Sequence, residues 1–379
     1  MALFDMVRKS GAYIEVAHVN YHKRESADRD ERIVRDYCAK YGIFFHLHDF
    51  DTQDHSGNFQ AAAREDRYGF FREICEKRKL DLVLVAHQMD DLIETYLMQK
   101  QRKLGVSYFG LKKENVLYGV KILRPLLGLT KKELSDYCDQ NAVPYGIDES
   151  NLEDGYTRNR IRHQVIEKMS YDRKNELAEK IENINNIREQ RYEKTASLIE
   201  KETFSVSSFQ RIPYLYDYLC LHFPSLSKAH YKEMRRQLIE TDKAVFEGED
   251  LILCKEYGKI MIFAKPEAYS YVFASLKQMC GFSCKRFRIE EEGKKIEGVC
   301  LAEEDFPLCV RNARKDDVIR MRFGKKKLNR FFIDRKISYK EELSWPLMVN
   351  GNGEVIFVTG LGCDVNHYCD DPDVFMIKC

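Results

Sequence analysis

The sequence predicts an α/β protein whose N-terminal part is built on a doubly wound parallel sheet. Segments with helical spacing alternate with short apolar segments along the first 170 residues, as in parallel strands joined by crossover helices. Leu82–Ala86 is an apolar run too short for a helix, and we interpret it as a strand buried on both faces. Alternating short strands towards the C-terminus predict a smaller α+β domain.

The N-terminal elements follow from residue spacing and from residues that typically begin or end helices. Ser26 is a plausible N-cap, and Thr130 with Glu133 has the spacing of a capping box, which predicts a helix that continues to Gln140. The remaining predictions are helices over Met1–Ser10, Ser26–Tyr41 and Gly57–Lys79, and strands over Tyr13–Asn20 and Phe44–Phe50.

Changes in composition predict three domains. Residues 1–170 form the α/β domain, residues 171–283 a helical linker and middle region, and residues 284–379 the α+β domain. Lys, Glu, Asn and Arg dominate Tyr171–Glu202, which predicts a long, mostly exposed helix. Gly258 separates two apolar runs and predicts a hairpin turn.

Composition narrows the class of protein. The 379 residues are 44% hydrophobic and 32% charged, an ordinary globular balance, and the net charge is +1. No apolar run of about twenty residues and no signal-peptide pattern is present, so we expect a cytoplasmic protein without a membrane partner. Twelve cysteines without a CxxC pair predict reduced thiols and no zinc site. Any nucleic-acid surface must come from local basic patches.

Three carboxylates follow the predicted strand Leu82–Ala86. Asp90, Asp91 and Glu94 come just after His87, at a spacing that allows all three to share one helix face. The carboxyl ends of strands are where open α/β sheets bind ligands, and Mg²⁺ shared with nucleotide phosphates would suit these groups. The alternative interpretation is that the acids complement the helix dipole.

Basic residues occur in three places. Arg64 and Arg67 lie three apart in the helix Gly57–Lys79, near Tyr68, and could clamp a phosphate or instead pair with neighbouring acids on a solvated face. The sequence RNRIR, residues 158–162, suits a nucleic-acid backbone or the basic face of a linker helix. The third place is the loop Lys325–Lys327, with similar alternatives. It precedes a predicted helix, Leu328–Lys336, whose inward residues are Phe331, Phe332 and Ile333.

The stretch AHQMDDLIET, residues 86–95, resembles the AHxxDDxxET motif of the PP-loop ATP pyrophosphatases. The stretches GNFQAAAREDRY, RPLL, SNLEDGYTRNRIR and GKKKLNRFFIDRKI resemble those of the tRNA(Ile)-lysidine synthetases within that group. The resemblance is close over roughly residues 1–169 and moderate over residues 317–361. It implies the fold of adenine nucleotide alpha hydrolases.

The resemblance implies a ligase that uses ATP and Mg²⁺. Free L-lysine would be joined to C2 of the wobble cytidine of an isoleucine tRNA with a CAU anticodon, through an adenylated tRNA intermediate. A homodimer is left open. The residues implied are, for catalysis, His87, Asp90, Asp91, Glu94 and Arg64, with Asp90 and Asp91 holding the metal; for nucleotide binding, Ala17, His18 and Ala86; and for tRNA binding, Arg67, Arg158, Asn159, Arg162, Lys325, Lys326 and Lys327.

One feature departs from the family pattern. The phosphate-binding motif SGGxDS does not occur in the sequence, and the first residues, MALFDMVRK, resemble the helix that follows this motif in the family. We therefore expect the chain as given to be inactive, whether it starts at an internal Met or lacks ATP chemistry altogether. The alternatives are another tRNA-modifying PP-loop enzyme, such as a thiolase, and a non-catalytic tRNA-binding protein. The absence of a CxxC pair counts against the thiolase.

Overall fold

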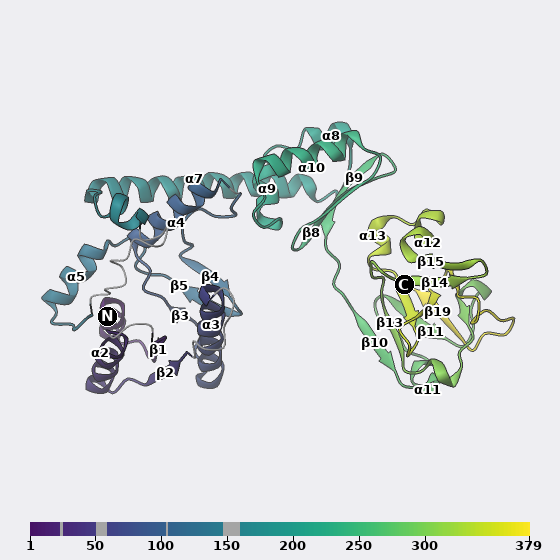
Figure 1. Cartoon of the computed structure of the whole chain (residues 1–379), viewed down its shortest axis with the longest axis horizontal. Coiled ribbons are helices and arrows are strands. Elements are labelled where there is room, and N and C mark those ends of the chain that lie inside the picture. The colour runs from purple at the N-terminus through teal and green to yellow at the C-terminus, as the bar shows by residue number, and fades with distance from the viewer. Residues whose placement is uncertain (23–25, 51–58, 104, 147–159) are drawn as a thin grey trace. The chain divides into compact units, whose positions relative to one another are not determined.

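The computed structural model describes residues 1–22, 26–50, 59–103, 105–146 and 160–379 (Figure 1). The chain divides into two compact units, one comprising Met1–Glu200 with Ile212–Glu233 and the other Lys201–Arg211 with Met234–Cys379. The division into three domains stays a prediction. Within the described residues, none of the helices combines the length and apolar character that a membrane span requires.

The first unit alternates helices and strands in the predicted order, which confirms the α/β class. Its elements are α1 (Ala2–Lys9), β1 (Val16–Asn20), α2 (Ser26–Tyr41), β2 (Phe45–Asp49), α3 (Phe59–Arg78), β3 (Val83–Leu84), α4 (Met89–Arg102), β4 (Glu114–Leu117), β5 (Val120–Leu123), α5 (Lys131–Gln140), a π-helical turn (Arg162–Ile166), α7 (Tyr171–Ile199) and α9 (Leu215–His222). The predicted capping box is confirmed, since Thr130 Oγ1 accepts from Glu133 N and Glu133 Oε2 accepts from Thr130 N.

The parallel strands form two separate pairs in the described residues. β1 pairs with β2, and β3 pairs with β5, which also forms an antiparallel hairpin with β4. A cavity of about 860 Å³ lies between the two pairs, with Val16 of β1 and Val83 of β3 in its wall. β3 was predicted to be buried on both faces, but it is only half buried and Leu82 is exposed. The prediction was wrong because, among the described residues, β5 is the strand that pairs with β3, and the other side of β3 faces the cavity.

Helix α7 is the structural support of α4. Ile181 of α7 is buried in one cluster with Met89 and Ile93 of α4. Asn185 donates to the carbonyl of Phe109 and accepts from its amide, both at 2.9 Å, and so holds the segment that follows α4. The helix was predicted to be mostly exposed, yet this face is buried, and the packing brings the N-terminal turn of α7 to the N-terminal turn of α4.

The second unit is mainly β. Its elements are β6 (Thr203–Ser205), α8 (Val206–Gln210), β7 (Ala244–Glu247), β8 (Leu251–Glu256), β9 (Lys259–Ala264), β10 (Ser270–Phe273), α11 (Leu276–Met279), β11 (Phe287–Glu290), β12 (Gly298–Val299), β13 (Leu308–Asn312), β14 (Val318–Met321), β15 (Gly324–Lys327), α12 (Leu328–Asp334), α13 (Tyr339–Glu342), β16 (Pro346–Val349), β17 (Val355–Val358), β18 (Gly362–Cys363) and β19 (Val374–Lys378). Helix α10 (Lys228–Glu240) spans the division between the units. The predicted hairpin at Gly258 is confirmed, because Glu256 pairs with Lys259.

The strands of this unit form a four-stranded antiparallel sheet, β6-β9-β8-β7, and two further sheets. The larger runs β10-β13-β16-β17-β14-β15, with β18 beside β17, and the smaller runs β11-β19-β12. Their facing sides bury one apolar cluster that contains Phe287 and Met348.

Two predictions for the basic segment of this unit were wrong. Lys325–Lys327 was predicted as a loop but belongs to strand β15, which pairs with β14. Phe331 and Phe332 are buried as predicted, whereas Ile333 is 39% exposed. Three successive helical residues differ by about 100° each in direction, so they cannot all face one core.

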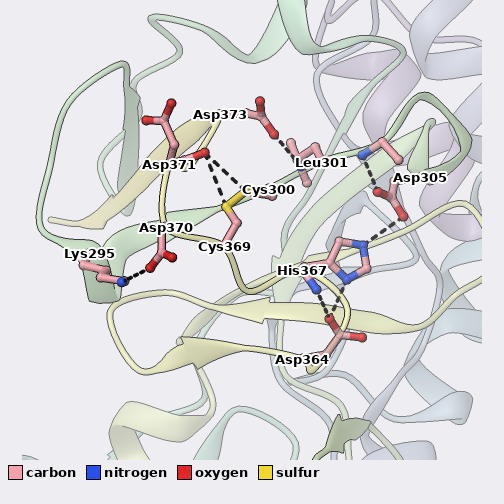
Figure 2. Close-up of a disulfide and its surroundings, with 11 residues drawn as sticks. Lys295, Cys300, Leu301, Asp305, Asp364, His367, Cys369, Asp370, Asp371 and Asp373 are labelled. Atoms are coloured by element: carbon pink, nitrogen blue, oxygen red, sulfur yellow. Dashed lines mark hydrogen bonds and ion pairs between the residues drawn. A yellow bond between two sulfur atoms is a disulfide. The ribbon is translucent and has the colours of Figure 1, made fainter.

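Figure 2 shows a disulfide between Cys300 and Cys369, which joins the chain after β12 to the chain before β19. The prediction that the cysteines are reduced thiols was therefore wrong for this pair. Beside it the ring of His367 lies between two buried carboxylates, with Nδ1 hydrogen-bonded to Asp364 and Nε2 3.0 Å from Asp305 Oδ1. Burial by itself lowers the pKa of His367. Hydrogen bonds to the two carboxylates raise it by more than burial lowers it, so the pKa lies above its usual value.

This raised pKa predicts a pH-dependent stability. The folded state binds the His367 proton more tightly than the unfolded state, so the stabilisation is complete below about pH 6.5, the unfolded pKa, and is lost as the pH rises through the folded pKa. We expect the free energy of unfolding to fall over that range by roughly 1.4 kcal/mol per pKa unit. Denaturant titrations of wild type and His367→Gln measure this, with the exposed His230→Gln as control. Equal pH profiles in all three proteins would contradict it.

Candidate functional site

The candidate site lies at the carboxyl ends of two neighbouring parallel strands. β3 and β5 are paired in parallel, so the residues that follow them emerge at the same edge of the sheet. His87 follows β3, Arg124 follows β5, and α4 begins directly after His87. The amide of Met89 donates to the carbonyl of Leu129 at 2.8 Å, which ties the start of α4 to the chain after β5. The sheet edge thus places the predicted carboxylates where open α/β sheets bind ligands.

The first turn of α4 is held by a capping box. The side-chain oxygen of Gln88 accepts from the amide of Asp90 at 2.8 Å, and Asp91 Oδ2 accepts from the amide of Gln88 at 3.0 Å. One oxygen of Asp91 therefore caps the helix, as the alternative interpretation of the acids expected. Its other oxygen, Oδ1, points to a different partner.

Two cations of the chain form ion pairs with the three carboxylates. Arg162 lies 3.1 Å from Asp91 Oδ1 and 2.7 Å from Glu94 Oε2, and Lys174 lies 2.7 Å from Asp90 Oδ1. Asp91 and Glu94 thus share one guanidinium, whereas Asp90 turns towards α7. The Glu94 side chain is fully buried and that of Asp90 is 9% exposed. In the part of the chain that the structure describes, these three negative and two positive groups leave one net negative charge at the start of α4.

His87 is oriented by a buried arginine. Arg124 Nε donates to His87 Nδ1 at 3.0 Å, and Arg124 Nη1 donates to the carbonyl of Lys112 at 2.8 Å. Because a guanidinium can only donate, Nδ1 must accept, and in the neutral ring the proton is therefore on Nε2. Burial lowers the pKa of Arg124 from its usual value. This pair sets the tautomer of the histidine at the sheet edge.

Two arginines of α3, Arg64 and Arg67, lie close to a buried tyrosine. The guanidinium carbons of Arg64 and Arg67 are 5.4 and 5.6 Å from the ring centre of Tyr68, which is 3% exposed and stacks on Tyr118. Arg67 Nε is buried and has no hydrogen-bond partner among the described residues. A buried donor without a partner costs free energy, and a phosphate oxygen would satisfy it.

The cavity between the strand pairs brings together the three residues predicted to bind nucleotide. Ala17 and His18 of β1 and Ala86 after β3 all contribute to its wall. Its volume of about 860 Å³ is in the range of small-molecule sites. Burial lowers the pKa of His18 below its usual value, so its ring is neutral at pH 7.

The remaining residues that were predicted to bind tRNA differ in their exposure and in their partners. Arg158 and Asn159 lie outside the described residues. Arg162 was predicted to contact tRNA, but its side chain is 19% exposed and holds two carboxylates. Lys325 and Lys327 are exposed on β15, whereas Lys326 forms an ion pair with Asp334. These lysines belong to the second unit.

Sequence reasoning missed Lys174 and Arg124. Lys174 lies in a segment interpreted as an exposed connector, and no spacing pattern links it to Asp90. Arg124 stands in the RPLL stretch, which was noted only for its resemblance. Its position directly after the alternating residues Val120–Leu123 was the one sequence signal that could have identified Arg124.

Residues 1–169 match a family model described as a PP-loop domain. The sheet edge and the helix with the AHxxDDxxET-like stretch therefore lie in a segment that is similar to the PP-loop domain family.

The chain is also similar to individual proteins. The tRNA(Ile)-lysidine synthase of Ureaplasma parvum is 42% identical over 43% of this chain and 50% of its own length. The synthase of Mycoplasma mycoides subsp. mycoides is 29% identical over 90% of this chain and 88% of its own length. A crystal structure of a TILS C-terminal domain aligns with 29% of this chain and 93% of its own at 22% identity, with a TM-score of 0.22. The chain is thus similar in sequence to the tRNA(Ile)-lysidine synthases of these two organisms. It spans about half the length of the Ureaplasma relative.

The shared guanidinium predicts a large effect on stability. Arg162→Met removes a cation from two carboxylates, one of them fully buried, so we expect the free energy of unfolding to fall by about 3 kcal/mol. In the double variant Glu94→Gln/Arg162→Met the loss should be smaller than the sum of the two single losses. Denaturant titration measures each variant, with Arg173→Met as the control because its pair with Glu176 is exposed. Strict additivity would show that the two groups do not act together.

Proposed function

We propose that this protein joins L-lysine to C2 of the wobble cytidine of an isoleucine tRNA with a CAU anticodon. The observation that carries the proposal is the similarity to tRNA(Ile)-lysidine synthases along 90% of the chain. ATP would adenylate the cytidine with release of pyrophosphate, and the lysine amine would then displace AMP. The names of these relatives favour lysidine formation over thiolation.

The donor set at the sheet edge fits a nucleotide. Arg67 Nε is a buried donor without a partner among the described residues, and Arg64 lies near the same tyrosine. Both could donate to phosphate, and bound ATP would supply the adenylyl group. Ala17, His18 and Ala86 would bind the nucleotide from the cavity wall. His87, with its Nε2 proton directed by Arg124, would donate a hydrogen bond.

The carboxylates fit Mg²⁺ through their net negative charge. Asp90 and Asp91 would bind the ion, and Glu94 would support them. Asp91 is a better candidate than Glu94 for a direct ligand of the metal ion. Its contact with Arg162 is 3.1 Å long, whereas that of Glu94 with Arg162 is 2.7 Å, and the other oxygen of Asp91 can stay on the helix cap. Arg162 would then hold the carboxylates in place, in addition to the contact with tRNA that we propose for it.

The tRNA would contact basic side chains of both units. Those proposed are Arg67, Arg158, Asn159, Arg162, Lys325, Lys326 and Lys327. Arg158 and Asn159 rest on the resemblance alone. Lys325 and Lys327 are better placed than Lys326, which already pairs with Asp334.

The SGGxDS motif does not occur in residues 1–379. We propose that these residues bind ATP weakly by themselves, because pyrophosphate binding needs several backbone N–H groups that converge on one anion. A segment that ends in SGGxDS, joined before Met1, should restore nucleotide binding. Calorimetry with ATP and Mg²⁺ on both forms measures this. Equally tight, Mg²⁺-dependent binding by residues 1–379 would refute it.

The role of Asp91 is tested in that extended form. Asp91→Asn keeps an oxygen for the helix cap but loses the charge, so we expect lysidine formation to fall at least about a hundredfold with the fold intact. The assay measures incorporation of labelled lysine into the tRNA, and thermal unfolding monitors the fold. The control is Asp172→Asn, an exposed acid of α7. Wild-type turnover in Asp91→Asn would remove this residue from the site.

A further inference from the structure

The hairpin β14–β15 carries an unusual tip. Met321 pairs with Gly324, so the loop consists only of Arg322 and Phe323. Gly324 has φ +111°, a conformation that side chains rarely adopt, which lets the chain reverse directly after Phe323. The Phe323 side chain is consequently fully exposed.

Cations gather on one face of this hairpin. Ile319 is fully buried and pairs with Lys326, so these two residues point to the inner face. Side chains alternate along a strand, which puts Arg320, Lys325 and Lys327 on the outer face. Arg320 and Lys325 are paired directly opposite each other.

Few acids of the described residues compensate these cations. Two like charges directly opposite each other on neighbouring strands are destabilising. Among the described residues, Arg320 forms an ion pair with Glu354 at 3.8 Å, and Asp334 pairs with Lys326. Arg322, Lys325 and Lys327 form no ion pair with a described carboxylate. Such a face becomes favourable when an external anion, such as a series of phosphates, lies against it.

Phe323 adds a second kind of contact. Phe331 and Phe332 of the next helix are buried, so the segment does bury its other aromatic rings. An exposed ring among four cations matches the combination of stacking platform and positive groove that binds unpaired nucleotides. A protein partner would require a larger apolar surface than one ring.

We propose that the tip of the β14–β15 hairpin binds an unpaired nucleotide of RNA, with Phe323 stacked on the base and Arg320, Arg322, Lys325 and Lys327 against the flanking phosphates. This inference rests on the proposed function for the identity of the RNA, but not on catalysis. It assigns base contact to Phe323, which lies outside every stretch predicted to bind tRNA.

The test is the affinity of the full chain for RNA, measured by fluorescence anisotropy over a salt series. We expect Phe323→Ala to weaken binding of the isoleucine tRNA by roughly five- to a hundredfold, and Phe323→Trp to preserve it. Phe323→Ala should leave the salt slope unchanged, whereas Lys325→Ala should reduce it by about one unit. The control is Tyr257→Ala, because Tyr257 is also exposed and also precedes the glycine of a hairpin.

Two RNA probes separate stacking from general affinity. Phe323→Ala should weaken binding to a duplex with an unpaired 3′ overhang, but not to the same duplex with blunt ends. Unchanged affinity of Phe323→Ala for the tRNA, or an equal loss for both duplexes, would overturn the inference. If Phe323→Ala lost binding to anionic lipid vesicles but kept its binding to RNA, this result would also overturn the inference, in favour of a membrane contact. Absence of lysidine formation in the form extended by SGGxDS, together with normal Phe323-dependent binding, would instead refute only the proposed function.

Discussion

Three carboxylates in the first turns of one helix, two of them buried, repel each other unless cations lie against them. In this protein the cations come from elements far away in the sequence. Arg162 bridges Asp91 and Glu94, and Lys174 pairs with Asp90. The packing of α7 on α4 is therefore an electrostatic requirement as well as an apolar contact. The start of α7 must lie at the start of α4 for Lys174 to reach Asp90.

This requirement also bears on how the site could work. A carboxylate oxygen that is already paired can bind a metal ion only if its present partner is displaced, and a longer contact is displaced more easily. Asp91 divides its two oxygens between the helix cap and Arg162, and the latter contact is the longer of the two made by Nη2 of that arginine. The His18 ring lines the cavity between the strand pairs, and the buried Nε of Arg67 is a donor that a phosphate oxygen could satisfy.

The second unit solves a different electrostatic problem. It buries His367 between Asp305 and Asp364, so that the positive charge of the protonated ring is compensated within the core. On the β14–β15 hairpin the opposite holds, because cations face each other across the strands and the acids nearby are few. Charge that is balanced inside contributes to folding, whereas charge left unbalanced on a surface is available to a polyanion.

Much of the fold follows from the sequence because its signals are local. The alternation of helices and strands, the capping box at Thr130, the Gly258 hairpin and the AHQMDDLIET stretch each depend on residues a few positions apart. Burial of β3 and exposure of Ile333 were predicted wrongly, because both depend on which neighbours pack against them. Local spacing also put Lys325–Lys327 in a loop, since strand pairing with β14 is not visible in a run of lysines.

The site divides in the same way. The sequence by itself determined that His87, Asp90, Asp91 and Glu94 gather at the end of a strand, because residues three or four apart share a helix face. Only the tertiary structure decided their partners. Lys174, Arg162 and Arg124 meet them through long-range packing, and long-range contacts leave no periodic signal in the chain. The charge state of the site is therefore a property of the folded protein, although its carboxylates can be read directly from the sequence.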